Sequence, residues 1–199
     1  MDLGLTEIQQ MLKNSAQEFL DRECPPTLVR ELEEDPRGYT DELWRLMVGL
    51  DWTGLPFAEE YGGTGGSFMD LTILLEEMGK ALVPGPFFAT VVLGGLTVSD
   101  AGTGQQKQEI LTRICDGSLL LTMALTEPSA TYEPWGVETT ATAQGDAYIL
   151  SGTKLFVPYA HVADYILCPA ETDSGGASRP PGVGGGATLF LVETTTAGI

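Results

Sequence analysis

The spacing of apolar residues changes at Gly117, and this change divides the chain into two parts with different expected secondary structure. Before Gly117, apolar side chains recur at the period of an amphipathic helix. After it, short runs rich in β-branched residues alternate with turn residues, which is the pattern of strands. We therefore predict an α+β protein with an all-helical domain over residues 1–117, followed by a β domain over residues 118–199.

Capping boxes indicate where helices of the first domain begin, because a Ser or Thr at the N-cap is followed three residues later by a polar partner. The pairs are Thr6 with Gln9, Ser67 with Asp70, and Thr103 with Gln106. Another helix is expected to start at Thr40. Prolines 25 and 26 stop the first helix, and Gly117 closes the last. The positions expected to face inward are Leu5, Ile8, Leu12, Phe19, Leu43, Leu46, Met47, Leu50, Leu71, Leu74, Leu75, Met78, Leu82, Ile110, Leu111 and Ile114.

Six segments of the second domain read as strands. They are residues 119–125, 137–143, 147–150, 154–157, 164–168 and 188–192. Residues 174–186 are rich in Gly and Pro and are expected to form a surface loop. Because so few strands cannot bury both faces of a sheet, we expect the β domain to be truncated.

Composition excludes several classes of function. The net charge of −18 repels nucleic acid and anionic membranes. No apolar run is long enough to span a bilayer, and the first residues do not resemble a signal peptide. The three cysteines, Cys24, Cys115 and Cys168, lack the spacing of a zinc site or a disulfide framework. We therefore expect a cytoplasmic protein with no bound metal.

Acidic pairs occur at residues 59–60 and 76–77, but neighbouring side chains on a helix point about 100° apart. We therefore interpret both pairs as solvated charge. The sole histidine, His161, is interpreted as a surface turn residue. The Gly-rich residues 62–66 lack the Walker pattern and follow no strand. Lys154 could contact a phosphate or cap a strand edge, and we favour the strand edge.

Three groups of motifs resemble the acyl-CoA dehydrogenases. The first is EEYGG at 59–63 followed by EEMG at 76–79, and the second is ALTEP at 124–128. The third is GDAYILSGTK at 145–154, followed by AD at 163–164 and LFLVE at 189–193. Each motif is weak by itself, but their order and spacing are fairly specific, and the similarity extends over essentially the whole chain.

This resemblance implies a helical N-terminal domain, a β-barrel-like middle domain that is truncated here, and a C-terminal four-helix bundle that is absent. It implies FAD bound between the middle and C-terminal domains. The implied reaction is the α,β-dehydrogenation of an acyl-CoA thioester, with the catalytic carboxylate in the absent bundle and flavin accepting the hydride. The resemblance therefore assigns no catalytic base to residues 1–199. The implied partners are an electron-transferring flavoprotein and other subunits, in a homo- or hetero-oligomer.

Carried over by position, the resemblance places Leu125 and Thr126 at the flavin ring as hydrogen-bond donors. It places Phe156 where the family has an aromatic residue that packs on the ring. Judged without the family, Thr126 reads as an ordinary β-branched strand residue and Phe156 as a core aromatic.

Two positions depart from the family pattern. Tyr132 stands where the family usually has a serine that contacts the cofactor or substrate. Pro158 replaces a Thr or Ser near flavin N5, and proline has no N–H to donate. The Thr-Glu-Pro run followed by a Tyr-acid pair also resembles the small subunits of two-component enzymes of the pimeloyl-CoA type.

Three hypotheses follow from the resemblance. The chain belongs to an FAD-dependent acyl-CoA dehydrogenase, to a non-catalytic partner subunit of such an enzyme, or to an acyl-CoA oxidase or flavin monooxygenase on the same scaffold. Tyr132 and Pro158 favour the partner subunit, whereas the Leu-Thr-Glu-Pro run from Leu125 favours the enzyme.

Overall fold

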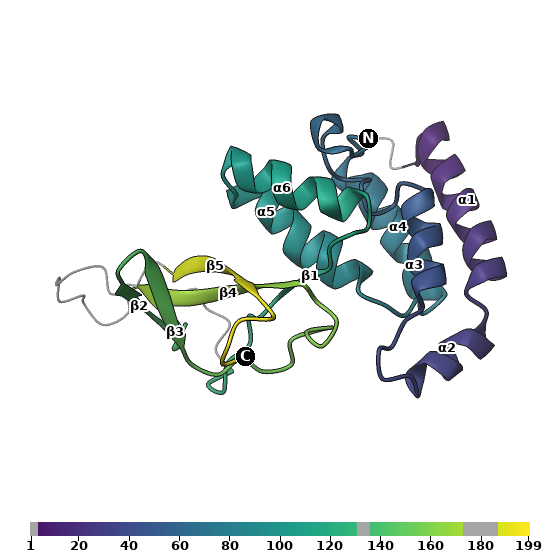
Figure 1. Ribbon diagram of the computed structural model, residues 1–199. Helices are drawn as coiled ribbons and strands as arrows, with labels where there is room; N and C mark the ends of the chain where they lie inside the picture. Colours follow the sequence, from purple (N-terminus) through teal and green to yellow (C-terminus); the bar gives the residue numbers. More distant parts are fainter. Residues whose placement is uncertain (1–3, 131–135, 173–186) are drawn as a thin grey trace. The chain divides into compact units, whose positions relative to one another are not determined.

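The computed structural model describes residues 4–130, 136–172 and 187–199. The chain divides into two compact units, Met1–Leu120 and Leu121–Ile199. The first contains the helices and the second the strands (Figure 1), which confirms the predicted α+β class. The helical elements are α1 (Glu7–Glu23), α2 (Pro26–Glu33), α3 (Asp41–Gly49), η1 (Glu59–Tyr61), α4 (Phe68–Lys80), η2 (Phe88–Gly95), α5 (Leu96–Ala101) and α6 (Gly104–Cys115).

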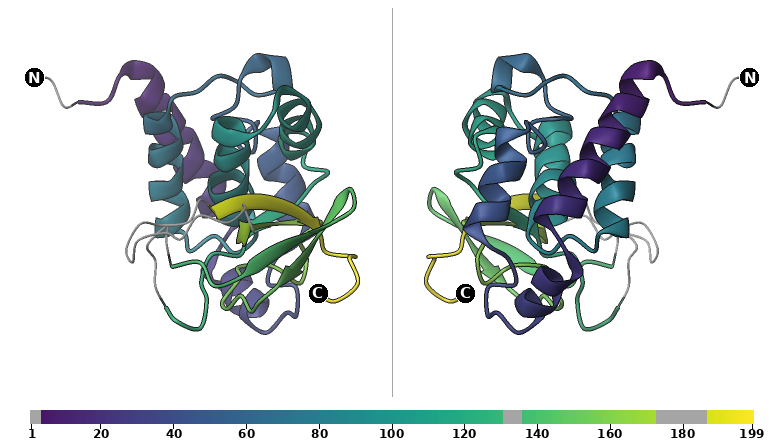
Figure 2. Two further views of the ribbon diagram at one scale, coloured as in Figure 1. Left: turned by 90° about the vertical axis from the view of Figure 1, so that its left-hand side faces the viewer. Right: turned by 90° about the vertical axis from the view of Figure 1, so that its right-hand side faces the viewer.

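The helix starts are the best predicted feature of the first unit. All three capping boxes form, at Thr6, Ser67 and Thr103, and Thr40 caps α3 by accepting a hydrogen bond from the Leu43 amide. α1 and α4 lie side by side in Figure 2. Gln9 Nε2 in α1 donates to Asp70 Oδ1 in the first turn of α4 at 3.0 Å, so the two N-terminal ends are adjacent.

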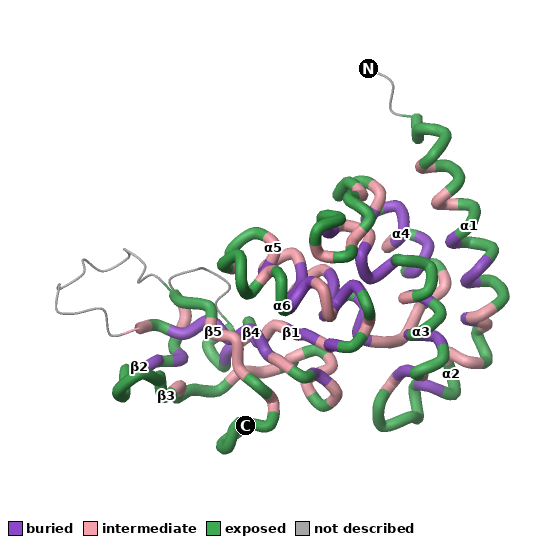
Figure 3. The backbone as a smooth tube through the Cα atoms, turned by 45° about the horizontal axis from the view of Figure 1, so that its top comes forward, coloured by how far each residue is buried: buried purple, intermediate pink, exposed green. Residues whose placement is uncertain are grey.

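The helical core is smaller than the apolar pattern predicts. Leu71, Leu74 and Leu111 are fully buried, and Figure 3 shows buried stretches along α4 and α6. By contrast Ile8 is 78% exposed and Leu82 is 70% exposed. The assignment of these two residues to the core is wrong, and Leu5, Leu46 and Leu50 are also exposed rather than buried. Ile8 lies in the second helical position of α1, where α4 covers only one side, and Leu82 follows the end of α4.

The capping signals of the sequence do not mark α2, η2 and α5. Pro26 occupies the first helical position of α2. A backbone N–H at this position would have no intrahelical acceptor, so proline loses no hydrogen bond there and can start the helix. The apolar stretch from Phe88 forms a π-helical turn, η2, that runs into α5 without a cap. Among the described residues, no helix combines the length and the apolar character that a membrane crossing requires.

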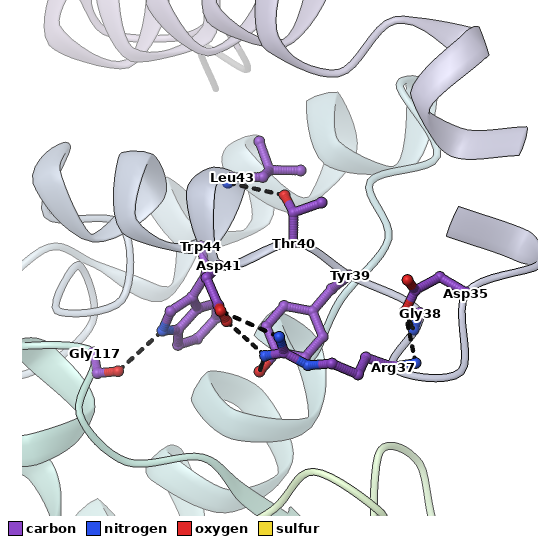
Figure 4. A network of polar contacts seen from close by, with 9 residues as sticks. All are labelled: Asp35, Arg37, Gly38, Tyr39, Thr40, Asp41, Leu43, Trp44 and Gly117. Carbon is purple, nitrogen blue, oxygen red and sulfur yellow. Dashed lines mark hydrogen bonds and ion pairs between the residues drawn. The ribbon is translucent and has the colours of Figure 1, made fainter. Parts of the chain in front are cut away.

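The end of α6 is fixed to α3 by a glycine. The Trp44 indole Nε1 donates to the Gly117 carbonyl at 3.0 Å (Figure 4). Gly117 has a φ of +74°, and a Cβ at this position would lie 2.4 Å from Val48 Cγ2. In the same view, Arg37 contacts Asp41 and Tyr39 on the loop before α3.

The second unit is one mixed sheet. Its strands are β1 (Leu121–Met123), β2 (Thr140–Gln144), β3 (Ala147–Ser151), β4 (Tyr165–Thr172) and β5 (Ala187–Glu193). The sheet order is β1-β4-β2-β3, and β5 pairs with β4. β2 and β3 form an antiparallel hairpin in which Thr140 pairs with Ser151, while β1 and β4 are parallel with Leu121 opposite Tyr165.

One predicted strand does not form. Residues 154–157 have no strand geometry, because Phe156 has a φ of 52°, which is left-handed and incompatible with a regular strand. Each of the five observed strands overlaps a predicted one, and β1 is shorter than expected. The predicted surface loop at 174–186 lies outside the described residues.

Candidate functional site

Two segments of the β unit lie against each other and carry four of the predicted flavin-contacting residues. They are residues 122–127, which continue from β1, and residues 154–158. The buried hydroxyl of Thr122 donates to the Pro158 carbonyl at 2.6 Å, and the Leu155 amide donates to the Thr126 carbonyl at 2.8 Å. Since residue 122 meets 158 and residue 126 meets 155, the two segments run antiparallel. The missing strand is thus replaced by an irregular but hydrogen-bonded segment.

Two apolar side chains on these segments are open to solvent. Phe156 is 88% exposed and Leu125 is 52% exposed, while Thr126 is half-buried. The interpretation of Phe156 as a core aromatic is therefore wrong. An exposed aromatic ring next to a Thr fits a flat aromatic ligand, which the side chain could cover.

Hydrogen-bonding groups also remain available beside Phe156. Within the described parts of the chain, the structure assigns no acceptor to the amides of Leu125 and Thr126 and no partner to the Thr126 hydroxyl. These donors suit the polar edge of a flavin ring. Pro158 has no N–H, and its carbonyl accepts the bond from Thr122, so residue 158 offers no donor. Tyr132 lies outside the described residues.

An ion pair joins the ends of the two segments. Lys154 Nζ lies 2.7 Å from Glu127 Oε1, and the side chains are only 9% and 3% exposed. The Glu127 carboxylate also accepts hydrogen bonds from the amides of Glu138 and Thr139 and from the Thr139 hydroxyl. Burial alone raises the pKa of Glu127, but the bonds from Lys154, Thr139 and Glu138 together lower it to about 2.

The sequence did not predict this ion pair. Lys154 neither caps a strand edge nor is free to meet a phosphate, because its ammonium group is bound to Glu127. The two residues are 27 positions apart, and no spacing rule connects them. The only available signal was that Glu127 and Lys154 each belong to one of the family motifs.

In the acidic pair at 76–77, Glu76 is exposed as predicted, whereas Glu77 is buried and contradicts the prediction of solvated charge. Glu77 is 4% exposed, and Lys80 Nζ lies 2.7 Å from the carboxylates of both Glu76 and Glu77. Lys13 of α1 approaches the same two carboxylates at 3.6 and 3.7 Å. The side chains of Lys13 and Lys80 are long enough to reach both carboxylates, although neighbouring side chains on a helix point in different directions. Because Lys13 belongs to α1 and the other three residues to α4, this cluster joins the two helices. The pair at 59–60 is solvated as predicted.

The other candidates carry no site. The amides of residues 62–66 all donate to carbonyls of residues 54–59, so none is available to a phosphate. His161 is exposed, and its ring lies 6.0 Å from that of Tyr159. In the described ranges, no three His, Cys, Asp or Glu side chains gather where they could hold a metal ion.

Comparison with known proteins covers both units. Residues 6–118 match the family model for the acyl-CoA dehydrogenase N-terminal domain, and residues 122–199 match that for the middle domain. A short-chain-specific acyl-CoA dehydrogenase of Megasphaera elsdenii is 34% identical over 100% of this chain and 51% of its own length. The caffeyl-CoA reductase-Etf complex subunit CarC of Acetobacterium woodii is 28% identical over 98% of this chain and 50% of its own length.

A solved structure agrees with these matches. A chain in the ChsE4-ChsE5 complex from Mycobacterium tuberculosis has a TM-score of 0.84 and 30% identity, and the match covers 100% of this chain and 50% of that one. The chain therefore spans about half the length of these relatives. Two family models in the expected order, relatives matched over the whole chain, and a shared fold agree: the chain belongs to the acyl-CoA dehydrogenase family of flavoprotein oxidoreductases, of which it contains the N-terminal and middle domains.

Proposed function

We propose that the protein carrying this chain is an FAD-dependent enzyme that dehydrogenates an acyl-CoA thioester between its α and β carbons. The observation that carries this proposal is the exposed Phe156 ring beside the open donors of Leu125 and Thr126. The Phe156 ring is 88% exposed and Leu125 on the adjoining segment is 52% exposed, so a flat aromatic ligand that packs there would cover apolar surface of both segments.

In this proposal the residues of the chain bind and orient the flavin. Bound FAD supplies the acceptor for the hydride. The Leu125 amide and the Thr126 amide or hydroxyl donate to the polar edge of the ring, and Phe156 covers one part of it and excludes water. Donors at that edge stabilise negative charge that develops there during reduction. The base that removes the α-proton is assigned to no residue of this chain.

An electron-transferring flavoprotein is the proposed electron acceptor, which the likeness to the caffeyl-CoA reductase-Etf complex subunit supports. A cytoplasmic location is proposed as well, because Cys24, Cys115 and Cys168 are all free thiols.

Pro158 favours a second candidate function. Since residue 158 cannot donate a hydrogen bond near the flavin, the protein could instead be a partner subunit that completes the site of a sister subunit without dehydrogenating a substrate itself. The likeness to a chain of the two-component ChsE4-ChsE5 complex supports this alternative.

The visible absorption spectrum separates the two candidates. The full-length protein is purified alone and together with a homologue encoded next to it. An oxidised-flavin band in the protein purified alone, bleached by an acyl-CoA, is expected for the enzyme. A flavin band that develops only in the pair would instead support the partner subunit, and no flavin in either sample would contradict both.

A further inference from the structure

Glu127 and Lys154 each stand next to a residue of the proposed flavin site. Glu127 directly follows Thr126, and Lys154 precedes Phe156 by two residues. The ion pair between them is therefore the last of three contacts along the two segments. The other two are the Leu155–Thr126 backbone bond and the Thr122–Pro158 bond.

Stability alone gives a weak reason for this pair. Removing a carboxylate and an ammonium from water carries a desolvation penalty that their attraction often only balances, and an apolar pair of similar volume is often as stable. The Glu127 carboxylate nevertheless accepts hydrogen bonds from four donors. The side chains of Glu127 and Lys154 are only 3% and 9% exposed. Such a network is rigid and directional, which an apolar contact is not.

Phe156 needs an external constraint of this kind. Because its ring is 88% exposed, side-chain packing does little to orient it. Its φ of 52° lies in a region that a bulky residue rarely adopts, so the backbone on both sides has to hold it. Pro158 is held on one side through Thr122, and Lys154 and Leu155 are held on the other through Glu127 and Thr126.

We propose that the buried Glu127–Lys154 ion pair is a positioning device that keeps Phe156 and the donors of Leu125 and Thr126 in register to bind the flavin. This inference rests on the proposed flavin site and adds two positioning residues to it. Neither residue touches the ring in this proposal. Glu127 and Lys154 act through the segments that they join.

The test uses the full-length protein in the assembly in which it purifies. The double variant Glu127→Gln/Lys154→Met removes the ion pair and leaves no unpaired buried charge, so it is expected to fold. Glu77→Gln is the matched control, because Glu77 is a buried carboxylate paired with lysines in the helical unit. The FAD dissociation constant, the visible flavin spectrum, the melting temperature and the hydrogen-exchange rate of the Leu155 amide are measured for each protein.

The double variant is expected to weaken FAD binding about tenfold, to shift the flavin spectrum and to speed exchange at Leu155 in the flavin-free protein. Glu77→Gln is expected to lower the melting temperature while it leaves the FAD dissociation constant within about twofold. A folded double variant with wild-type FAD affinity would overturn the proposal. Equal weakening by Glu77→Gln would also overturn it, because the effect would then be general destabilisation.

The exchange rate separates failure of this inference from failure of the proposed function. If the wild-type protein bound no FAD, the proposed function would be refuted, and with it the flavin-binding role of the pair. Faster exchange at Leu155 in the double variant would then still show that the ion pair holds the two segments together. Unchanged exchange would refute the mechanical part of the inference as well.

Discussion

Phe156 combines two properties that are each unfavourable for a bulky residue. Its ring is 88% exposed, and its backbone is left-handed. A left-handed conformation costs a non-glycine residue roughly 1–2 kcal/mol. Residues that keep such strain commonly lie at functional sites, where the surrounding structure enforces it. A role for Phe156 in covering the flavin, rather than in stabilising the fold, accounts for both properties.

Phe156→Gly is expected to change the free energy of unfolding by less than about 1 kcal/mol. The relief of backbone strain offsets the greater flexibility that glycine gives the unfolded chain. FAD affinity is expected to fall, because the covering ring is lost. Urea unfolding and a flavin titration measure the two effects. Phe57→Ala is the control, since the buried Phe57 should cost about 3–5 kcal/mol when it is removed. A large loss of stability in Phe156→Gly would mean that the ring packs in the fold.

Glu127 makes the stability of the protein depend on pH in acid. Its pKa is lowered from 4.5 to about 2 in the folded state, so its contribution is complete above pH 4.5 and is lost as the pH falls toward 2. The difference in unfolding free energy between wild type and Glu127→Gln should therefore shrink over this range. Urea unfolding at a series of pH values measures it. A difference that stays constant from pH 6 down to about 2 would contradict the assignment.

Neighbouring groups do not reverse this sign. Among the described residues, Lys154 is the only side-chain cation bound to Glu127, and Thr139 and the Glu138 amide are uncharged donors. Cys168 also lies near the pair, but burial raises the pKa of its thiol, so it stays neutral in acid. Other carboxylates with lowered pKa, such as Asp70, are present in both proteins and cancel in the difference.

At the scale of elements, local signals predicted more than long-range ones could. The side chains of Thr6, Ser67 and Thr103 act within four residues, and the sequence therefore located these helix starts correctly. The state of Ile8 depends on which side of α1 meets α4, which no local pattern contains. The conformation of residues 154–157 depends likewise on contacts with residues 122–127.

The junction of α3 and α6 gives a prediction at the same scale. Gly117→Ala is expected to destabilise the protein by about 2 kcal/mol or more, because the new Cβ would meet Val48 and the φ of +74° disfavours alanine. Gly79→Ala is the matched control. Gly79 lies in α4, and a Cβ added there would have nothing within 4 Å, so alanine should stabilise by roughly 0.5–1 kcal/mol. Thermal unfolding of both variants measures the contrast, and equal effects would refute it.

At the scale of the whole molecule, the family motifs predicted the class of protein correctly, whereas the geometry of the proposed flavin site depends on contacts in the folded chain. The family resemblance predicts that Leu125, Thr126 and Phe156 contact a flavin. It could not show that an ion pair joins the segments on which they lie. Glu127 and Lys154 are 27 residues apart, so no periodic sequence pattern connects them. The net charge of −18 is compatible with many classes of enzyme and therefore does not predict which one this is.

Residues 1–199 expressed alone are expected to fold but to lose FAD during gel filtration. The family resemblance implies that FAD lies between the middle and C-terminal domains, and this chain spans about half the length of its relatives. A ring held on one side by Phe156, Leu125 and Thr126 has its other face in water, so much of the contact area that would bind it is missing. Flavin absorbance in the protein peak measures retention, with the full-length protein as control. Stoichiometric FAD on the fragment would show that the N-terminal and middle domains suffice to bind the cofactor.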